Sequence, residues 1–418
     1  MGDSLRDQLL HGMGELQTVD CHAHTAGPAE YAAAAPLSLF TMGSYFERDI
    51  QSVSGKGGGE LYAGCTTDAQ RWQRLRPVLA KARNVSYWRH NLVAYRELFG
   101  LEDEELTDGN WRAVNEAMLA RTAQAGWYQH VTVERCKLRT QVKNIPWFED
   151  WEPEYFIAIL RMERALELWR PGSRAALEEH LGVAITDLPS CLQAIGALVA
   201  EYQQRGAVGI KLAHAYRRTL HSEPVSAVAA SAIFDRALRG KRLRPADIKR
   251  FEDHVIFFLA GLCTDAGLIF DIHTGVQGNW GRVPESDPLG LIPLIHAHRR
   301  TRFNLYHAGY PYAREIGMLG KHAPNVWLNM AWMYVITMAG SRQLLSEWLD
   351  LVPGYRVLGF GSDVRWPELI LGHLVMAREC LADVLAEKVR RDFLSAEAAL
   401  ELATMLMRDN AVAFYGLR

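Results

Sequence analysis

The chain has 418 residues, 49% of them hydrophobic, so it is long enough for one large domain or two ordinary ones with a sizeable core. Its 46 basic and 48 acidic residues leave a formal net charge of −2, which argues against a nucleic-acid binder held by counterion release. No stretch approaches 18 uncharged apolar residues, and residues 1–17 lack the apolar core of a signal peptide, so we expect neither a membrane partner nor export. The six cysteines are scattered without a CxxC pair, which is typical of reduced thiols and favours a cytoplasmic enzyme.

Short apolar runs predict eight β-strands, at 16–21, 130–135, 155–161, 208–213, 268–273, 302–307, 325–330 and 357–361. Amphipathic helical patterns lie between most of them, for example at 187–205, 245–266, 289–299, 313–322 and 341–351. Alternation of strand and helix predicts parallel strands, and eight such units indicate an α/β fold, the (β/α)8 TIM barrel.

About a hundred residues separate the first two predicted strands and carry helical patterns at 69–82, 85–98 and 108–125. The glycine-rich stretch 54–59 has neither a preceding strand nor a GK[ST] ending, so it is expected to be a flexible loop rather than a phosphate-binding loop. Closing helices are expected at 369–385, 386–394 and 396–410. We therefore divide the chain into the start of the barrel (1–30), a helical insertion that caps the catalytic face (31–127), and the rest of the barrel (128–418).

Histidines and one aspartate stand where predicted strands end. His22 and His24 are two residues apart, so on a strand their imidazoles point to the same face and can share a metal ion. His273, His307 and Asp363 end the fifth, sixth and eighth predicted strands. A single histidine at a strand end is more often structural, but catalytic groups of TIM barrels come from the C-terminal ends of several strands. The set therefore predicts a functional site at the C-terminal ends of the strands.

The order His22-x-His24, His273, His307, Asp363 resembles the amidohydrolase superfamily, and the second half of the chain is similar to its amidohydrolase-2 group. The segments 209–211, 215–217, 272–275 and 307–315 are also similar to the amidohydrolase-like domain that is fused to glutamine-synthetase-like proteins in some organisms. The resemblance covers roughly residues 16–30 and 128–418.

The resemblance implies that His22, His24, His273 and Asp363 bind a divalent metal. Zn²⁺ is the first expectation, Mn²⁺, Fe²⁺ and Ni²⁺ are alternatives, and one ion is favoured over two. Asp363 and His307 would be catalytic: Asp363 would accept the proton of a water whose pKa the metal lowers to about 7, and His307 would polarise the scissile carbonyl. In a two-metal variant His307 would become a ligand.

Lys211, on the fourth predicted strand, has three interpretations. It could be a carboxylated lysine that bridges two metals, a charged partner of an anionic substrate, or a member of an ion pair beneath the pocket. The other residues that we expect to contact substrate are Tyr216, Arg217, Arg161, Trp280 and Trp366, although a structurally paired arginine or an ordinary packed tryptophan is an equal alternative. His214 and Cys21 are expected to be structural.

The sequence therefore predicts a metal-dependent hydrolase that acts on an amide, lactone or related bond of a small, polar, carboxylated substrate. A decarboxylase is the alternative, followed by a uronate-isomerase-like enzyme and a non-catalytic binding protein. A small-molecule substrate is the expected partner, and a homo-oligomer stays open on base rates.

Overall fold

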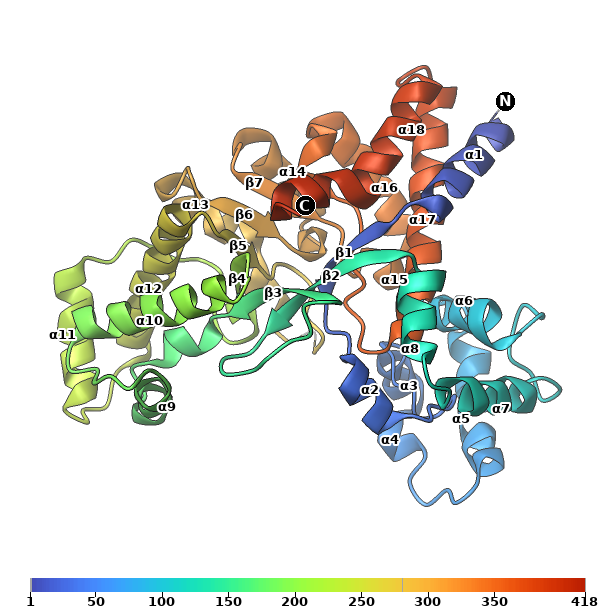
Figure 1. The fold of residues 1–418 in the computed structure, drawn as a ribbon, viewed down its shortest axis with the longest axis horizontal. Coiled ribbons are helices and arrows are strands. Elements are labelled where there is room, and N and C mark those ends of the chain that lie inside the picture. The colour runs from blue at the N-terminus through green and yellow to red at the C-terminus, as the bar shows by residue number, and fades with distance from the viewer. Residues whose placement is uncertain (1, 280, 418) are drawn as a thin grey trace. The chain divides into compact units, whose positions relative to one another are not determined.

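The computed structural model describes residues 2–279 and 281–417. Its eight strands form one sheet in sequential order: β1 (Thr18–Ala23), β2 (Leu138–Ile145), β3 (Phe156–Arg161), β4 (Gly209–Leu212), β5 (Ile269–Ile272), β6 (Arg302–Leu305), β7 (Val326–Asn329) and β8 (Val357–Leu358). Neighbouring strands from β3 to β8 are parallel, and helices connect them (Figure 1). The predicted TIM barrel with a helical insertion after its first strand is confirmed.

The chain forms two compact units. Unit 1 comprises Met1–Gln141, Ala331–Ser346 and Phe360–Asp409, and unit 2 comprises Val142–Met330, Glu347–Gly359 and Asn410–Arg418. Helix α16 (Met338–Leu351) contributes residues to both.

Unit 1 combines β1 with the helices of the insertion. These are α2 (Pro28–Ala34), α3 (Glu47–Ser54), α4 (Gly58–Leu61), α5 (Asp68–Ala82), α6 (Ser86–Phe99), α7 (Trp111–Thr122) and α8 (Trp127–Gln129). It also contains α1 (Gly2–Glu15), α15 (Met333–Ile336), α17 (Pro367–Arg390) and α18 (Ala396–Thr404). Helix α17 packs against α6 and α1. A Cβ at Gly372 would lie 2.6 Å from the carbonyl oxygen of His90, so glycine permits the close approach of α17 to α6.

Backbone hydrogen bonds tie β1 to chain segments on both sides. The amide of Thr18 donates to the carbonyl of Lys137 (2.9 Å), and the amide of Cys21 donates to the carbonyl of Phe360 (3.0 Å), just after β8. The end of β1 is thereby held next to the segment that carries Asp363.

Unit 2 contains most of the barrel wall. Its helices are α9 (Pro171–Leu181), α10 (Leu188–Gln204), α11 (Ala227–Leu238), α12 (Pro245–Ala266), α13 (Ile292–Ala297), α14 (Ala313–His322) and α19 (Asn410–Tyr415). Phe270 and Phe303 are fully buried neighbours on β5 and β6, with ring centroids 5.7 Å apart. A Cβ at Gly209 would lie 2.6 Å from the carbonyl oxygen of Ile269, so β4 needs glycine there.

The strand predicted at 130–135 is wrong, because His130–Arg135 is a π-helical turn that continues α8, and β2 follows at Leu138–Ile145. The hydroxyl of Thr132 donates to the carbonyl of Tyr128 (2.8 Å), four residues earlier, as in a helix. Alternation of Val and Thr imitated a strand, whereas the true strand carries polar residues that hide its apolar pattern.

Two smaller expectations also differ. Helix α17 is continuous, not broken near 385, because Ala386, Glu387 and Lys388 are good helix formers with no glycine or proline between them. Within the glycine-rich stretch, α4 already begins at Gly58, where the Glu60 carboxylate accepts a hydrogen bond from the amide of Gly57 (3.2 Å).

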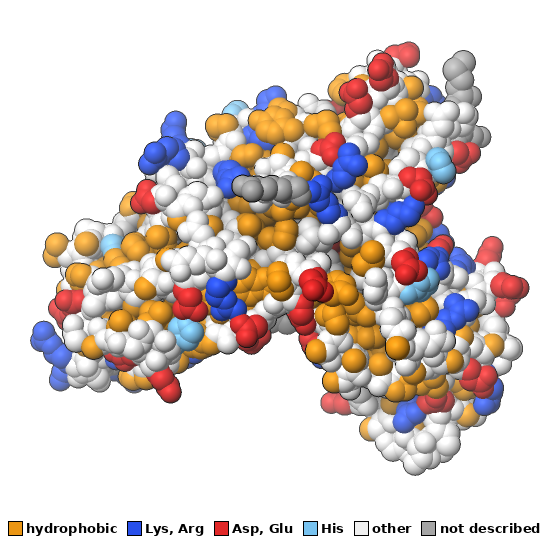
Figure 2. Space-filling model, viewed as in Figure 1, with side chains coloured by type: hydrophobic (Ala, Val, Ile, Leu, Met, Phe, Trp, Pro, Cys, Tyr) orange, Lys and Arg blue, Asp and Glu red, His pale blue; other side chains and the backbone are white. Residues whose placement is uncertain are grey.

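On the face drawn in Figure 2, basic and acidic side chains are interspersed, in agreement with the near-zero net charge. Among the described residues, no helix combines the length and the apolar character that crossing a membrane requires. No disulfide joins the six cysteines, all of which lie in the described part of the chain.

Candidate metal centre

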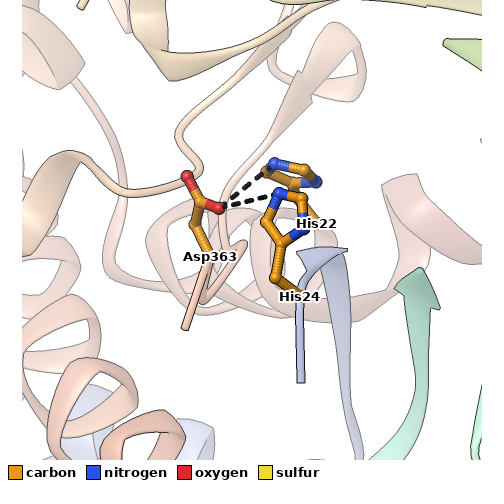
Figure 3. Close-up of side chains that lie close together, drawn as sticks. All are labelled: His22, His24 and Asp363. Carbon is orange, nitrogen blue, oxygen red and sulfur yellow. Dashed lines mark ion pairs between the residues drawn. The ribbon is translucent and has the colours of Figure 1, made fainter. Parts of the chain in front are cut away.

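His22, His24 and Asp363 converge in unit 1 (Figure 3). The Nε2 atoms of His22 and His24 lie 3.3 and 3.4 Å from the same oxygen, Oδ1 of Asp363. The side chains of His22 and Asp363 are 1% and 6% exposed, whereas that of His24 is 46% exposed. The predicted pairing of the two histidines with the aspartate after β8 is therefore present, with one open side.

The backbone builds this convergence locally. Residues two apart on β1 share a face, which brings His22 and His24 together. The amide of Asp363 donates to the carbonyl of His22 (2.9 Å), and Asp363 has φ +54°, a left-handed conformation that aspartate tolerates better than most residues. The hydroxyl of Tyr45, from the insertion, donates to the carbonyl of Asp363 (2.6 Å).

Two further residues hold the centre and were not predicted. Oδ1 of Asp20 accepts hydrogen bonds from the amides of His22 (3.2 Å) and Ser362 (2.8 Å), which links β1 to the loop of Asp363. Burial raises the pKa of Asp20 to about 7, although these hydrogen bonds oppose the shift. On α17, Nδ1 of His373 is 2.9 Å from the carbonyl of Ser362. The position of Asp20, two residues before His22 on one strand face, is the signal that could have indicated its role.

The three donors fit a divalent metal. Their coordinating atoms all lie within 4.8 Å of one another. Ligands about 2.0–2.1 Å from a tetrahedral Zn²⁺ are roughly 3.3 Å apart, close to the two nitrogen–oxygen distances seen here. Two imidazoles and one carboxylate also suit Mn²⁺, Fe²⁺ and Ni²⁺.

His273 and His307 form a second cluster, in unit 2, at the ends of β5 and β6. Nε2 of His273 donates to the carbonyl of Val276 (2.7 Å), so its Nδ1 accepts the hydrogen bond from Nε2 of His307 at 3.0 Å. Both residues are buried, with exposures of 4% and 0%. The structure thus brings these two predicted residues together, while the membership of His273 in the metal centre stays a prediction.

Glycine makes room for this histidine pair. His307, Ala308 and Gly309 have φ of +61°, +50° and +58°, and Gly275 has φ +66°. A Cβ at Gly275 would lie 2.3 Å from the carbonyl carbon of Gly309. The loops after β5 and β6 can therefore meet only with glycine at position 275.

Lys211 lies among buried polar groups of the barrel. It is 3% exposed, and its Nζ is 4.0 Å from the centroid of the Tyr306 ring. The Asp271 carboxylate accepts hydrogen bonds from the Tyr306 hydroxyl (2.5 Å) and the Asn304 amide (2.9 Å). Burial raises the pKa of Asp271 to about 6, against the lowering effect of these bonds and of the Lys211 charge. The three interpretations of Lys211 stay predictions.

The residues expected to contact substrate have protein partners. Nε of Arg161 is 3.3 Å from Glu163, and Arg217 forms an ion pair with Glu167; both arginines are about 40% exposed. The Tyr216 hydroxyl accepts from the amide of Gly278 (3.0 Å). Contact of these three residues with substrate stays a prediction.

Of the two tryptophans expected to contact substrate, the structure describes Trp366. Trp366 is 6% exposed, meets the Tyr31 ring edge-on and carries the Arg365 guanidinium 4.8 Å from its ring centroid. It packs at the start of α17, and a role in lining a pocket stays a prediction. Trp280 lies outside the described residues.

A TIM barrel with a His-x-His pair at the end of its first strand and an aspartate after its last defines a class of barrel enzymes with a candidate metal centre. Residues 168–417 match the family model described as Amidohydrolase, and the chain belongs to this family. The predicted superfamily is confirmed, whereas the likeness to fused glutamine-synthetase-like proteins stays a prediction.

Several of the particular relatives are named uronate isomerases. The chain is 27% identical over 279 residues to a uronate isomerase of Nostoc punctiforme, a match that covers 62% of this chain and 58% of the relative. It resembles the crystal structure of a uronate isomerase from Thermotoga maritima, with TM-score 0.84, 15% identity, and 99% and 97% of the two chains covered. A glucuronate isomerase structure from Caulobacter crescentus gives TM-score 0.82, 19% identity, and 100% and 94% coverage. At these identities the two structures support the fold alone.

These relatives overturn the predicted reaction. Hydrolysis is the leading interpretation of the sequence and decarboxylation the alternative, but the curated relatives from Nostoc punctiforme and Sphingopyxis alaskensis are named uronate isomerases. The physical reason is that a metal held by histidines and an aspartate can polarise a carbonyl group as readily as it can activate water. The chain is an enzyme of the amidohydrolase superfamily, and the donor set alone does not select its reaction.

Proposed function

We propose that the chain is a metal-dependent isomerase that interconverts the aldose and ketose forms of a uronate. The similarity to the Nostoc uronate isomerase carries this proposal. It is supported by the convergence of His22, His24 and Asp363 at the end of β1. A uronate is a small, polar, carboxylated molecule, as expected from the sequence.

In this proposal His22, His24 and Asp363 hold one divalent cation, with Zn²⁺ as the first candidate and Mn²⁺, Fe²⁺ and Ni²⁺ as alternatives. His273 is proposed as a further ligand. Bound there, the cation would act as a Lewis acid on the carbonyl and the adjacent hydroxyl oxygen of the sugar. Asp20 and Tyr45 would keep the ligands in place through their hydrogen bonds.

The reaction requires proton carriers. Conversion of an aldose to a ketose removes hydrogen from C2, adds hydrogen to C1, and moves a hydroxyl proton from O2 to O1. We assign acid–base roles to His307 and Asp363. The hydrogen bond of His307 to His273 fixes the ring position of His307, and an imidazole can give and take a proton near neutral pH.

The substrate carboxylate requires a cationic partner. Besides Lys211, Arg161 and Arg217, we propose Arg365, which follows Asp363 by two residues and was not predicted. Its side chain is 61% exposed, and it is held by Glu30 (3.0 Å) and by the Trp366 ring. A guanidinium presents two parallel donors to a carboxylate, and exchange of Glu30 for substrate would keep the charge paired.

The remaining expectations belong to the same proposal: the insertion 31–127 caps the catalytic face, and the enzyme works in the cytoplasm.

The test is turnover of D-glucuronate by the purified protein after reconstitution with Zn²⁺ or Mn²⁺. We expect formation of the ketose, and a loss of about 100-fold or more in His22→Ala because a ligand is removed. His11→Ala, on the exposed face of α1, is the matched control and should keep full activity. Release of CO2, or no ketose from any uronate with any of these metals, would reject the proposal.

A further inference from the structure

The insertion contains a cavity that has no part in the metal centre. It lies in unit 1 among α3, α4, α5 and α6 and has a volume of about 170 Å³. A cavity of about 150 Å³ accommodates benzene in another protein, so this one can hold a single six-membered ring with a short substituent.

Aromatic side chains form much of its wall: Phe40, Phe46, Tyr62, Trp88 and Tyr95. The ring centroids of Phe46 and Trp88 are 4.9 Å apart, and those of Phe40 and Tyr62 are 5.5 Å apart at an interplanar angle of 76°. Faces of aromatic rings carry negative electrostatic potential and attract organic cations. The wall therefore suits a ligand that is both apolar and positively charged.

Asn91, which lines the cavity, also carries a buried hydrogen-bond acceptor. Asn91 is 4% exposed, and its Nδ2 donates to the Ser44 hydroxyl (3.0 Å). Its Oδ1 is buried and has no hydrogen-bond partner among the described residues. Since a buried carbonyl oxygen without a donor is costly, this atom calls for an N–H or O–H group inside the cavity.

The Glu47 carboxylate lies on the same wall. Two glycines make room for it: a Cβ at Gly43 would lie 2.8 Å from Oε1 of Glu47, and one at Gly58 would lie 2.9 Å from its Cγ. Burial raises the pKa of Tyr62, and the negative charge of Glu47 adds to the increase, so this charge acts on the aromatic wall. The cavity thus offers two acceptors, one of them charged.

We propose that this cavity binds a small organic amine, with its ring among the aromatic side chains and its ammonium group facing Asn91 and Glu47. A protonated amine supplies the donors that Asn91 needs, the charge that Glu47 attracts, and an apolar body that fits the volume. A neutral alcohol lacks the charge, and a carboxylic acid would be repelled by Glu47.

The test compares benzylamine with its neutral analogue benzyl alcohol by calorimetric titration at pH 7. We expect benzylamine to bind about tenfold more tightly. Glu47→Gln should remove this preference, and Asn91→Leu should weaken the binding of benzylamine severalfold. Glu116→Gln, an exposed glutamate on α7 that does not line the cavity, is the matched control and should bind like the native protein.

Equal binding of the two compounds would overturn the proposal, as would a preference for benzylamine that persists in Glu47→Gln. Because Glu47 is exposed, its substitution should leave the fold intact, so the test does not depend on Asn91→Leu being stable. A crystal soaked with benzylamine gives an independent decision. Density for the ring between Trp88 and Tyr62 supports the site, and ordered water alone beside Oδ1 of Asn91 refutes it.

Discussion

The candidate metal centre of unit 1 depends most on the precise placement of Asp363. Its side chain is 6% exposed, its backbone has φ +54°, and two imidazoles face one of its oxygens. Hydrogen bonds from Tyr45 and to His22 hold its backbone on both sides. A negative charge in this buried position needs a compensating cation.

Replacement of Asp363 by asparagine should therefore remove the metal. The amide side chain would keep the shape but lose the charge and one strong ligand oxygen, so we expect less than about a tenth of the native metal content and a loss of about 100-fold or more in turnover. Elemental analysis of the purified variant gives the metal content. Asp265→Asn, exposed on α12, serves as the control, and a variant that keeps both metal and activity would contradict the assignment.

At this scale the sequence predicts the candidate ligands better than the residues that hold them in place. His22, His24 and Asp363 are visible because strand alternation and strand ends have simple signatures. Tyr45 and His373 are not, since they reach the centre from a helical insertion and from α17, whose paths depend on tertiary packing. The exposed or buried state of Arg161 and Arg217 also depends on partners, Glu163 and Glu167, that no local pattern indicates.

At the scale of elements, the barrel was predictable because buried parallel strands are short apolar runs between amphipathic helices. The second strand was the exception. Arg139, Gln141 and Lys143 interrupt the apolar pattern of β2, and Gln141 is nevertheless buried. A polar strand inside a barrel can be recognised only when its neighbours are known.

The loops after β5 and β6 give a prediction for one backbone position. Gly275→Ala should lower the free energy of unfolding by about 2–4 kcal/mol, because alanine is disfavoured at φ +66° and its Cβ would collide with the backbone of Gly309. The same shift should displace His273 from His307 and reduce turnover.

Denaturant unfolding and kinetics on the same preparation measure both effects of Gly275→Ala. Gly196→Ala, inside α10 with nothing near the new Cβ, should instead stabilise the protein by about 0.5–1 kcal/mol. Equal effects of the two substitutions would contradict this account.

One side chain of the insertion contacts a residue of the candidate metal centre. Tyr45→Phe removes the hydroxyl that donates to the Asp363 carbonyl but keeps the ring against Trp332, whose centroid is 4.5 Å away. We expect turnover to fall about tenfold, with a loss of about 1 kcal/mol or less in the free energy of unfolding. Tyr355→Phe, 52% exposed, is the control, and native turnover in Tyr45→Phe would show that the insertion has no such role.

For the whole molecule, buried histidines should control stability in acid. Burial lowers the pKa of His90 to about 4 and those of His214 and His373 to about 3. Below pH 6.5 the unfolded chain binds protons on these residues that the folded chain does not bind. The stability that these neutral histidines contribute is therefore complete above pH 6.5. Between pH 6.5 and the folded pKa of each histidine, the free energy of unfolding falls by about 1.4 kcal/mol per pH unit for that histidine.

His214 allows this to be tested alone, because neither of its ring nitrogens has a hydrogen-bond partner among the described residues. As the pH is lowered from 7.5 to 4.5, the free energy of unfolding of His214→Leu should rise by about 2–3 kcal/mol relative to that of the native protein. Urea unfolding at a series of pH values measures the change. His322 is exposed at the end of α14, so the free energy of unfolding of His322→Gln should depend on pH as that of the native protein does. The same pH dependence in His214→Leu as in the native protein would refute the linkage.

The function of the whole chain is where the sequence was least informative. The candidate ligands are compatible with hydrolysis, decarboxylation and isomerisation, and neither the loops nor the insertion carries a sequence signature that identifies a substrate. Similarity to uronate isomerases changes the reaction, not the site: the same His22, His24 and Asp363 are retained in the new proposal.

Proton NMR of D-glucuronate with the metal-reconstituted enzyme tests the proposed function most directly. The proposal predicts that the anomeric signals of the aldose decline while the signals of the corresponding ketose grow, and that Asp363→Asn abolishes the change. Unchanged aldose signals with enzyme that has been shown to hold its metal, or loss of the carboxylate as CO2, would contradict it.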